Sequence, residues 1–376
     1  MPVLVCLALL ILSAVGGGLV ASNESQYRQP TGSAQQAQPS WPQQQQQQGD
    51  YVAREFRFGS GEVLPELRLH YITIGTPQRD ANGRVTNAVL IMHGTGGSGR
   101  QFLSPQFADE LYAPGQPLDA SRYFIILPDA IGHGGSSKPS DGLRMKFPQY
   151  DYDDMVRAQH LLVTEGLGVN HLRLVMGTSM GCMHSFAWAE TYPDMMDALL
   201  PLACLPVEIA GRNRQWRKLA MDAIRNDPSW QNGNYTEQPV GLRTAIALLQ
   251  VVGPASHQQQ KNLPTREQAD KALEDYVAAR MRATDANDFL YYFNSSRNYN
   301  LAPHLEKIAA PLVHINFADD FINPPELGIA EREIEKVKRG RYILVPIGDD
   351  TVGHGTHTRA RVWKHYLIEL LRETER

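Results

Sequence analysis

The stretch Leu172–Trp188, LRLVMGTSMGCMHSFAW, constrains the fold more than any other part of the chain. A short apolar run of strand length leads into Gly-x-Ser-x-Gly at residues 177–181, and apolar residues with good helix propensity follow. This context is typical of a nucleophile elbow, in which a sharp turn exposes the serine hydroxyl. The glycines leave room for the turn, and the helix N-terminus offers N–H groups to an oxyanion. The stretch therefore predicts Ser179 as a nucleophile, with a chance match in a glycine-rich chain as the alternative.

Apolar runs of strand length alternate with segments of helical spacing through most of the chain. Two β-rich runs within residues 56–75 predict an antiparallel hairpin. The alternation favours an α/β fold with a mostly parallel central sheet flanked by helices. The polar, helix-leaning span 207–303 interrupts it and predicts an inserted helical cap. Expected strands lie at 88–92, 124–127, 172–176, 198–205, 311–317 and 342–347, and expected helices at 152–167, 326–338 and 358–372.

The N-terminus predicts export. Residues 1–22 carry no charged side chain and contain an apolar core followed by small residues, as in a secretory signal peptide cleaved near Ala21 or Ser22. An N-terminal anchor that is never cut is the alternative. Residues 23–50 are rich in Gln and Pro and predict a disordered linker to a domain spanning 51–376. We therefore expect a secreted or periplasmic protein without stable membrane insertion after cleavage.

Charge and cysteine content narrow the function classes. The net charge of −4 and the lack of a basic patch interleaved with aromatic residues give no sign of a nucleic-acid partner. Of the three cysteines, Cys6 lies in the N-terminal apolar segment. With only Cys182 and Cys204 left, a disulfide framework is not expected, and two buried thiols are the default interpretation.

A serine nucleophile needs a neighbouring base, and that base needs an acceptor to orient it. In enzymes with such an elbow, the acid and then the histidine follow the serine on loops after later strands. Asp320 follows the expected strand 311–317, and His354 follows the expected strand 342–347. The order predicts a triad of Ser179, Asp320 and His354. The rival acids are Asp319, Asp349 and Asp350, and the rival base is His357.

Two backbone N–H groups are expected to form an oxyanion hole, that of Met180 after the nucleophile and that of Thr95 after the strand 88–92. The glycine-rich loop that contains Thr95 lacks the lysine of a phosphate-binding loop. His354 and His357 have the spacing His-x-x-His, but no third metal ligand accompanies them. We expect no metal and no organic cofactor.

The elbow and its sequel, GTSMGCMHSFAWAETYPDMMD, resemble the homoserine O-acetyltransferase branch of the α/β-hydrolase superfamily. The cap sequence AIRNDPSW with the Gly-Asn-Tyr that follows, the run DFINPP at 320–325 and the pair Gly353-His354 resemble the same branch. The resemblance extends from about Phe56 to the C-terminus. It implies the α/β-hydrolase fold and the same three triad residues.

The departures from this branch bear on the substrate. In homoserine acetyltransferases an aspartate after the Gly-His helps to hold the substrate amine, and this chain has Gly355 there. Their cap arginine for the substrate carboxylate, at the end of a Gly-Leu-x-x-Ala-Arg run, is matched by Ile246. An amino-acid zwitterion would leave two charges without partners in a desolvated site. A signal peptide also fits poorly with acetyl-CoA, which is cytoplasmic.

These features together predict an exported serine hydrolase that transfers the acyl group of an ester to water through an acyl-enzyme. One alternative is an O-acyltransferase that uses acyl-CoA, as homoserine O-acetyltransferases do. The other is a non-catalytic binding protein of the same fold. The expected partner is a small-molecule acyl ester, and the long cap is a candidate surface for a homodimer.

Overall fold

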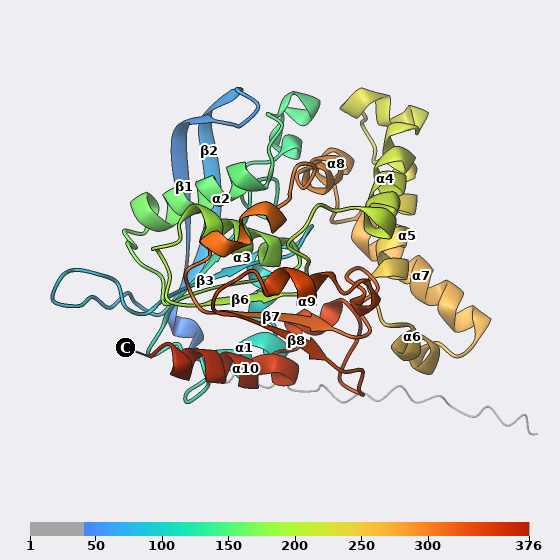
Figure 1. Ribbon diagram of the computed structural model, residues 1–376. Coiled ribbons are helices and arrows are strands. Elements are labelled where there is room, and N and C mark those ends of the chain that lie inside the picture. Colours follow the sequence, from blue (N-terminus) through green and yellow to red (C-terminus); the bar gives the residue numbers. More distant parts are fainter. Residues whose placement is uncertain (1–40, 376) are drawn as a thin grey trace, which may run out of the picture. The chain divides into compact units, whose positions relative to one another are not determined.

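The computed structural model describes residues 41–375, so the predicted signal peptide and most of the predicted linker lie outside the described residues. Eight strands form one sheet in the order β1-β2-β4-β3-β5-β6-β7-β8 (Figure 1). The six strands from β3 to β8 run parallel, and the β1–β2 hairpin joins the sheet through an antiparallel pair with β4. The strands are β1 Gln46–Arg57, β2 Val63–Ile74, β3 Ala88–Met92, β4 Phe124–Pro128, β5 Leu174–Thr178, β6 Leu199–Leu202, β7 Leu312–Phe317 and β8 Gly340–Val345.

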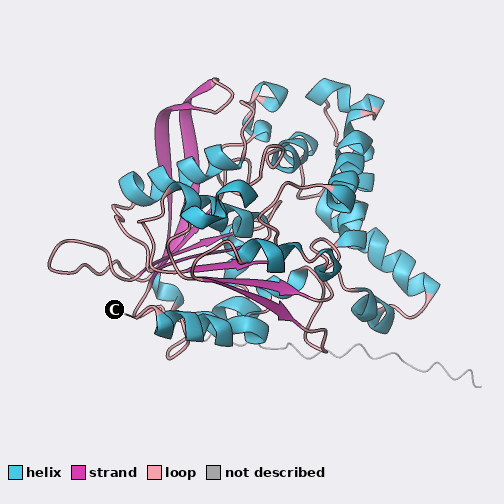
Figure 2. Cartoon of the chain, viewed as in Figure 1, coloured by secondary structure: helices cyan, strands magenta, loops and turns pink. Residues whose placement is uncertain are grey.

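The central strands β3 to β7 are buried along their whole length, as their continuous apolar sequences predict. Helices α1 (Pro105–Leu111) and α10 (Ala360–Glu373) pack on one face of the sheet. Helices α2 (Tyr152–Leu161), α3 (Met180–Thr191) and α9 (Ile329–Ile334) pack on the other face (Figure 2). The predicted α/β architecture with a mostly parallel sheet is confirmed.

The first strand begins earlier than the predicted domain boundary at Tyr51. β1 starts at Gln46, and the register pairs Gln46 with Ile74 and Asp50 with His70. The prediction of a disordered linker up to residue 50 is therefore wrong for its last five residues. Strand pairing uses backbone N–H and C=O groups, so a polar glutamine run can extend an edge strand without supplying core side chains.

Five helices occupy the span predicted for the cap, and they pack around an apolar cluster of their own. Several apolar side chains of the cap are exposed, among them Leu219 at 55%, Val240 at 68% and Val251 at 67%. Dimerisation through the cap stays a prediction. In the described part of the chain, no helix has the length and apolar character needed to cross a membrane. The cap helices are α4 Gly211–Arg225, α5 Gly241–Val252, α6 Ser256–Asn262, α7 Arg266–Met281 and α8 Ala286–Asn294.

Candidate active site

Ser179 lies where the chain turns from β5 into α3. Its backbone has φ 55° and ψ −110°, a positive-φ conformation that side-chain-bearing residues rarely adopt. A Cβ on Gly177 would lie 2.2 Å from the carbonyl oxygen of Gly181. A Cβ on Gly181 would lie 2.0 Å from the carbonyl oxygen of Met92 in β3. Both glycines are therefore sterically required for the sharp turn that presents the Ser179 hydroxyl.

A chain of hydrogen bonds joins Ser179, His354 and Asp320. His354 Nε2 lies 2.8 Å from Ser179 Oγ, and His354 Nδ1 lies 2.8 Å from Asp320 Oδ2. An ionised carboxylate can only accept, so Nδ1 carries the proton and Nε2 accepts from the serine hydroxyl. The three residues follow β5, β7 and β8, and the carboxyl ends of parallel strands meet at one edge of the sheet. The structure thus brings together the three residues predicted from chain order.

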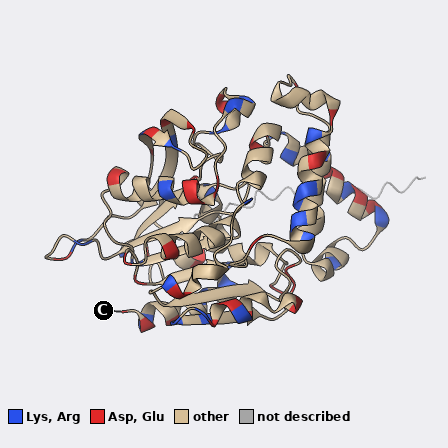
Figure 3. Ribbon diagram, turned by 45° about the horizontal axis from the view of Figure 1, so that its top comes forward, with Lys and Arg blue, Asp and Glu red and all other residues tan. Residues whose placement is uncertain are grey.

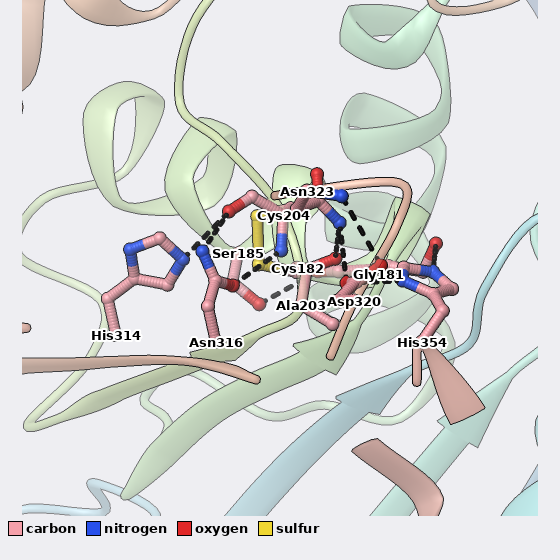
Figure 4. Close-up of a disulfide and its surroundings, with 11 residues drawn as sticks. Gly181, Cys182, Ser185, Ala203, Cys204, His314, Asn316, Asp320, Asn323 and His354 are labelled. Atoms are coloured by element: carbon pink, nitrogen blue, oxygen red, sulfur yellow. Dashed lines mark hydrogen bonds and ion pairs between the residues drawn. A yellow bond between two sulfur atoms is a disulfide. The ribbon is translucent and has the colours of Figure 1, made fainter. Parts of the chain in front are cut away.

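Donors from its own loop hold Asp320. The backbone N–H groups of Ile322 and Asn323 donate to Oδ1 over 2.8 and 3.2 Å, and Asn323 Nδ2 donates to Oδ2 over 3.1 Å. Burial alone would raise the pKa of the Asp320 carboxyl, but the interaction with His354 and these hydrogen bonds outweigh it and hold that pKa below its ordinary value. Asn323 Nδ2 also donates to the Ala203 carbonyl, which ties the Asp320 loop to the end of β6 (Figure 4).

The rival residues have other surroundings. Asp319 accepts a hydrogen bond from a backbone N–H in the loop of His354, over 3.0 Å. Asp349 and Asp350 have exposed side chains. The ring of His357 is buried edge-on against that of His354, with centroids 5.2 Å apart. Both nitrogens of His354 are engaged in the chain to Ser179 and Asp320, so the His-x-x-His spacing does not present two free ligands.

A cavity of about 180 Å³ lies between Ser179 and the cap. Thr95 lines it beside Ser179, and a Cβ on Gly94 would lie 3.8 Å from Ser179 Oγ, so this loop passes close to the nucleophile. Met180 is the first residue of α3, where backbone N–H groups lack intrahelical acceptors. Both residues proposed for the oxyanion hole therefore lie beside the serine. A larger cavity, of about 780 Å³, lies at the amino ends of the strands beside α10 and contains none of these residues.

The comparisons with known proteins agree with this geometry. A family model described as alpha/beta hydrolase fold matches residues 87–344. The chain belongs to the α/β-hydrolase fold family. The homoserine O-acetyltransferase of Pelobacter propionicus is 29% identical over 340 residues, which cover 81% of this chain and 90% of that protein. The predicted resemblance to the homoserine O-acetyltransferase branch is confirmed, and the chain is an enzyme of this acyltransferase and esterase family.

Two solved structures share the fold. The homoserine O-acetyltransferase from Bacillus anthracis has a TM-score of 0.76 at 21% identity, and the match covers 87% of this chain and 97% of that chain. Esterase E22 has a TM-score of 0.75 at 19% identity, and the match covers 87% of this chain and 100% of the esterase chain. Identities this low show the α/β-hydrolase fold and do not separate transfer from hydrolysis.

The cap of this α/β-hydrolase-fold enzyme places two residues on the cavity wall that sequence reasoning missed. They are Trp216 and Arg217, both buried members of α4. Ile246, predicted to replace an arginine, also lines the cavity. The sequence feature that could have identified Arg217 is a charged residue within the apolar stripe of a helix. Arg217 shares the buried face of α4 with Ala220 and Ile224.

A disulfide joins Cys182 and Cys204, so the prediction of two free buried thiols is wrong. Cys182 lies in the first turn of α3, and Cys204 lies two residues beyond the end of β6. Because β5 and β6 are adjacent and parallel, residues that follow them meet at the same edge of the sheet. The Cys204 carbonyl also accepts hydrogen bonds from Asn316 Nδ2 and, over 3.0 Å, from the His314 ring (Figure 4). The disulfide therefore links α3, the helix that follows the nucleophile, to the end of β6, which the Asp320 loop also contacts.

Reduction of this disulfide should lower the free energy of unfolding by about 3 kcal/mol, the expected value for a closed loop of some twenty residues. Denaturant unfolding with and without dithiothreitol measures the change. A double variant, Cys182→Ser with Cys204→Ser, should be insensitive to the reductant, and Cys6→Ser should behave as the parent protein. Equal stability of the oxidised and reduced protein would contradict the structural role of the bond.

Buried histidines are expected to make the enzyme sensitive to acid, and three of them have large shifts of pKa. Burial lowers the pKa of His184 and of His357 to about 3, and that of His314 to about 4. In the unfolded chain these rings titrate near pH 6.5. Between the two pKa values the unfolded state binds more protons, so stability rises with pH. We expect the full stability above about pH 6.5 and a loss of about 1.4 kcal/mol per pH unit for each histidine as the pH falls toward 4.

Asp288 acts in the opposite sense, because burial raises the pKa of its carboxyl to about 6. Burial also lowers the pKa of His93 and His133 and raises that of three further acids, so the histidines still outnumber the acids and we expect the net slope to keep its sign. Thermal unfolding between about pH 4.5 and 8 checks this prediction. His314→Gln should flatten the slope by about one proton, and the exposed His257→Gln should leave it unchanged. A melting temperature that does not vary over this range would refute it.

Proposed function

We propose that this enzyme is an O-acyltransferase with a serine nucleophile. It moves a short acyl group from an ester or thioester to an alcohol through an acyl-enzyme on Ser179. The hydrogen-bonded chain from Ser179 through His354 to Asp320, beside a cavity under the cap, supports this proposal most directly. The name of the 29% identical relative, homoserine O-acetyltransferase, favours transfer over the hydrolysis predicted from the sequence. The cavity of about 180 Å³ favours a small acyl group.

Each half of the proposed reaction moves one proton through His354. In the first half, Ser179 Oγ attacks the donor carbonyl while Nε2 takes the hydroxyl proton. The bond from Oγ to carbon forms, the bond to the leaving group breaks, and His354 protonates the departing thiol or alcohol. The N–H groups of Met180 and Thr95 stabilise the oxyanion. In the second half, the acceptor hydroxyl gives its proton to His354 and bonds to the acyl carbon, and Ser179 leaves with that proton.

A second candidate, an exported esterase, is favoured by the disulfide between Cys182 and Cys204. Disulfides form and persist mainly in oxidising compartments such as the periplasm and the extracellular space. Under this candidate, residues 1–22 direct export and water accepts the acyl group. Fractionation of cells that express the full chain tests the location, since an exported protein should be found outside the cytoplasm with its N-terminal segment removed.

One pair of assays separates the two candidates. The purified protein is incubated with acetyl-CoA, with and without homoserine or a simple alcohol, and separately with p-nitrophenyl acetate. Acceptor-dependent release of CoA supports the transferase. Ester hydrolysis that alcohols do not compete with supports the esterase. Failure to turn over either donor, together with failure of a fluorophosphonate to label Ser179, would overturn both.

A further inference from the structure

The cap presents an unpaired cation to the cavity beside Ser179. Arg217 on α4 is only 4% exposed. Its Nε donates to the neutral Asn213 Oδ1 over 2.8 Å, and its Nη1 is buried without a hydrogen-bond partner among the described residues. Among the described residues, no carboxylate forms an ion pair with Arg217. A guanidinium stays protonated even when buried, so this position carries an uncompensated charge that is costly unless an anion binds there.

The neighbouring residue adds a second unpaired donor. The indole Nε1 of Trp216 is buried and has no partner among the described residues. Trp216 and Arg217 both line the cavity that contains Ser179 and His354. The Arg217 guanidinium lies 5.0 Å from the Trp216 ring centre and 5.3 Å from that of Phe293, and this aromatic packing restrains the cation. Two adjacent residues with unpartnered N–H donors thus line the same cavity as the nucleophile.

The charge balance of the cavity selects the sign of its ligand. Among the described residues that line it there is no aspartate or glutamate, and its other arginine, Arg280, is exposed. Basic residues also prevail over acidic ones on α4 (Figure 3). A substrate ammonium group would therefore find no anionic partner here. A carboxylate matches the planar fork of Arg217, and the cavity of about 180 Å³ favours a small anion.

We propose that Arg217 and Trp216 form a carboxylate-binding subsite, so that the substrate is a small ester that carries a free carboxylate and no amine. This inference names the substrate class of the proposed acyl transfer and rests on it. The carboxylate lies either on the acyl group, as in a half-ester of a dicarboxylic acid, or on the alcohol, as in an acylated hydroxy acid. Both present the same group to Arg217, and both differ from an amino acid in lacking the ammonium group.

Two matched pairs of esters test the subsite and distinguish the sources. Monomethyl succinate against methyl butyrate places the charge on the acyl side, and 4-acetoxybutanoate against butyl acetate places it on the alcohol side. Hydrolysis is followed by acid release. In the pair that carries the charge on the correct side of the ester, the wild-type kcat/KM should be about 10-fold to 100-fold higher for the anionic ester than for the neutral one. Arg217→Met should abolish that preference, and Arg217→Lys should keep part of it. Arg214→Met, which removes an exposed arginine from the same helix, should preserve it.

A binding measurement separates failure of the subsite from failure of the proposed function. Calorimetric titration of monomethyl succinate and 4-hydroxybutyrate into Ser179→Ala protein reports on the subsite even if no ester is cleaved. Monomethyl succinate should bind if the carboxylate lies on the acyl group, and 4-hydroxybutyrate should bind if it lies on the alcohol. Arg217→Met added to Ser179→Ala should lower the affinity for that ligand by about 10-fold or more. If Arg217→Met fails to fold, the comparison with Arg217→Lys decides. The proposal would be overturned if the wild-type enzyme showed no preference and Ser179→Ala protein bound neither ligand. A preference that survives Arg217→Met would also overturn it.

Discussion

Ser179→Ala should lower kcat by roughly 10⁴-fold to 10⁶-fold, because it removes the atom that forms the acyl-enzyme. The remaining groups can still polarise a bound ester, so a small residual rate above that of water is expected. The measurement is steady-state hydrolysis of p-nitrophenyl acetate and acetyl-CoA turnover on the purified variant. Labelling by a fluorophosphonate should disappear in parallel.

Ser185→Ala is a suitable control for this result. Ser185 lies on the same helix, α3, and its buried hydroxyl donates to the Gly181 carbonyl over 2.9 Å. It takes no part in the chain from Ser179 to Asp320, so its loss should affect stability more than rate. If Ser179→Ala retained the parent rate and labelling, the acyl-enzyme mechanism would be wrong.

Asp320→Asn should lower kcat by about 10⁴-fold while the fold survives. An asparagine can turn an N–H toward His354 Nδ1, which then serves as the acceptor and shifts the ring proton to Nε2. In that tautomer the ring cannot take the proton of Ser179. The Asn side chain is close in shape to the Asp that accepts from Ile322 and Asn323, so we expect a folded but slow enzyme.

Asp319→Asn provides the matched comparison, since it changes the adjacent acid in the same way. The Asn carbonyl oxygen can still accept from the backbone N–H of Gly353, so the loop should keep its position and the rate should change only a few-fold. A larger loss for Asp319→Asn than for Asp320→Asn would reverse the assignment of the acid.

The parts of this site that sequence predicted are those encoded locally. The elbow around Ser179 is a strand, a five-residue turn and a helix in succession, and Asp320 and His354 each follow a recognisable buried strand. Parallel topology then brings the three together, because successive strands end at one edge of the sheet. The same reasoning placed the central strands within a few residues of their observed bounds.

The parts it did not predict depend on tertiary packing. The disulfide requires α3 and the end of β6 to be neighbours, which a separation of 22 residues does not reveal. Arg217 becomes a cavity residue only because the cap folds over the sheet, and a lone arginine on a cap helix is ordinarily solvated. Gln46 joins β1 through backbone pairing alone, which residue composition does not record.

The position of the disulfide also bears on the order in which the site can be assembled. β5, α3 and β6 are consecutive in the chain, so the ring between Cys182 and Cys204 can close as soon as this segment has left the ribosome. At that stage Asp320 and His354, which lie far along the chain beyond the cap, have not yet been synthesised. Since chains fold from the N-terminal side during synthesis, a covalently fastened elbow can serve as the template on which the acid and base loops later dock.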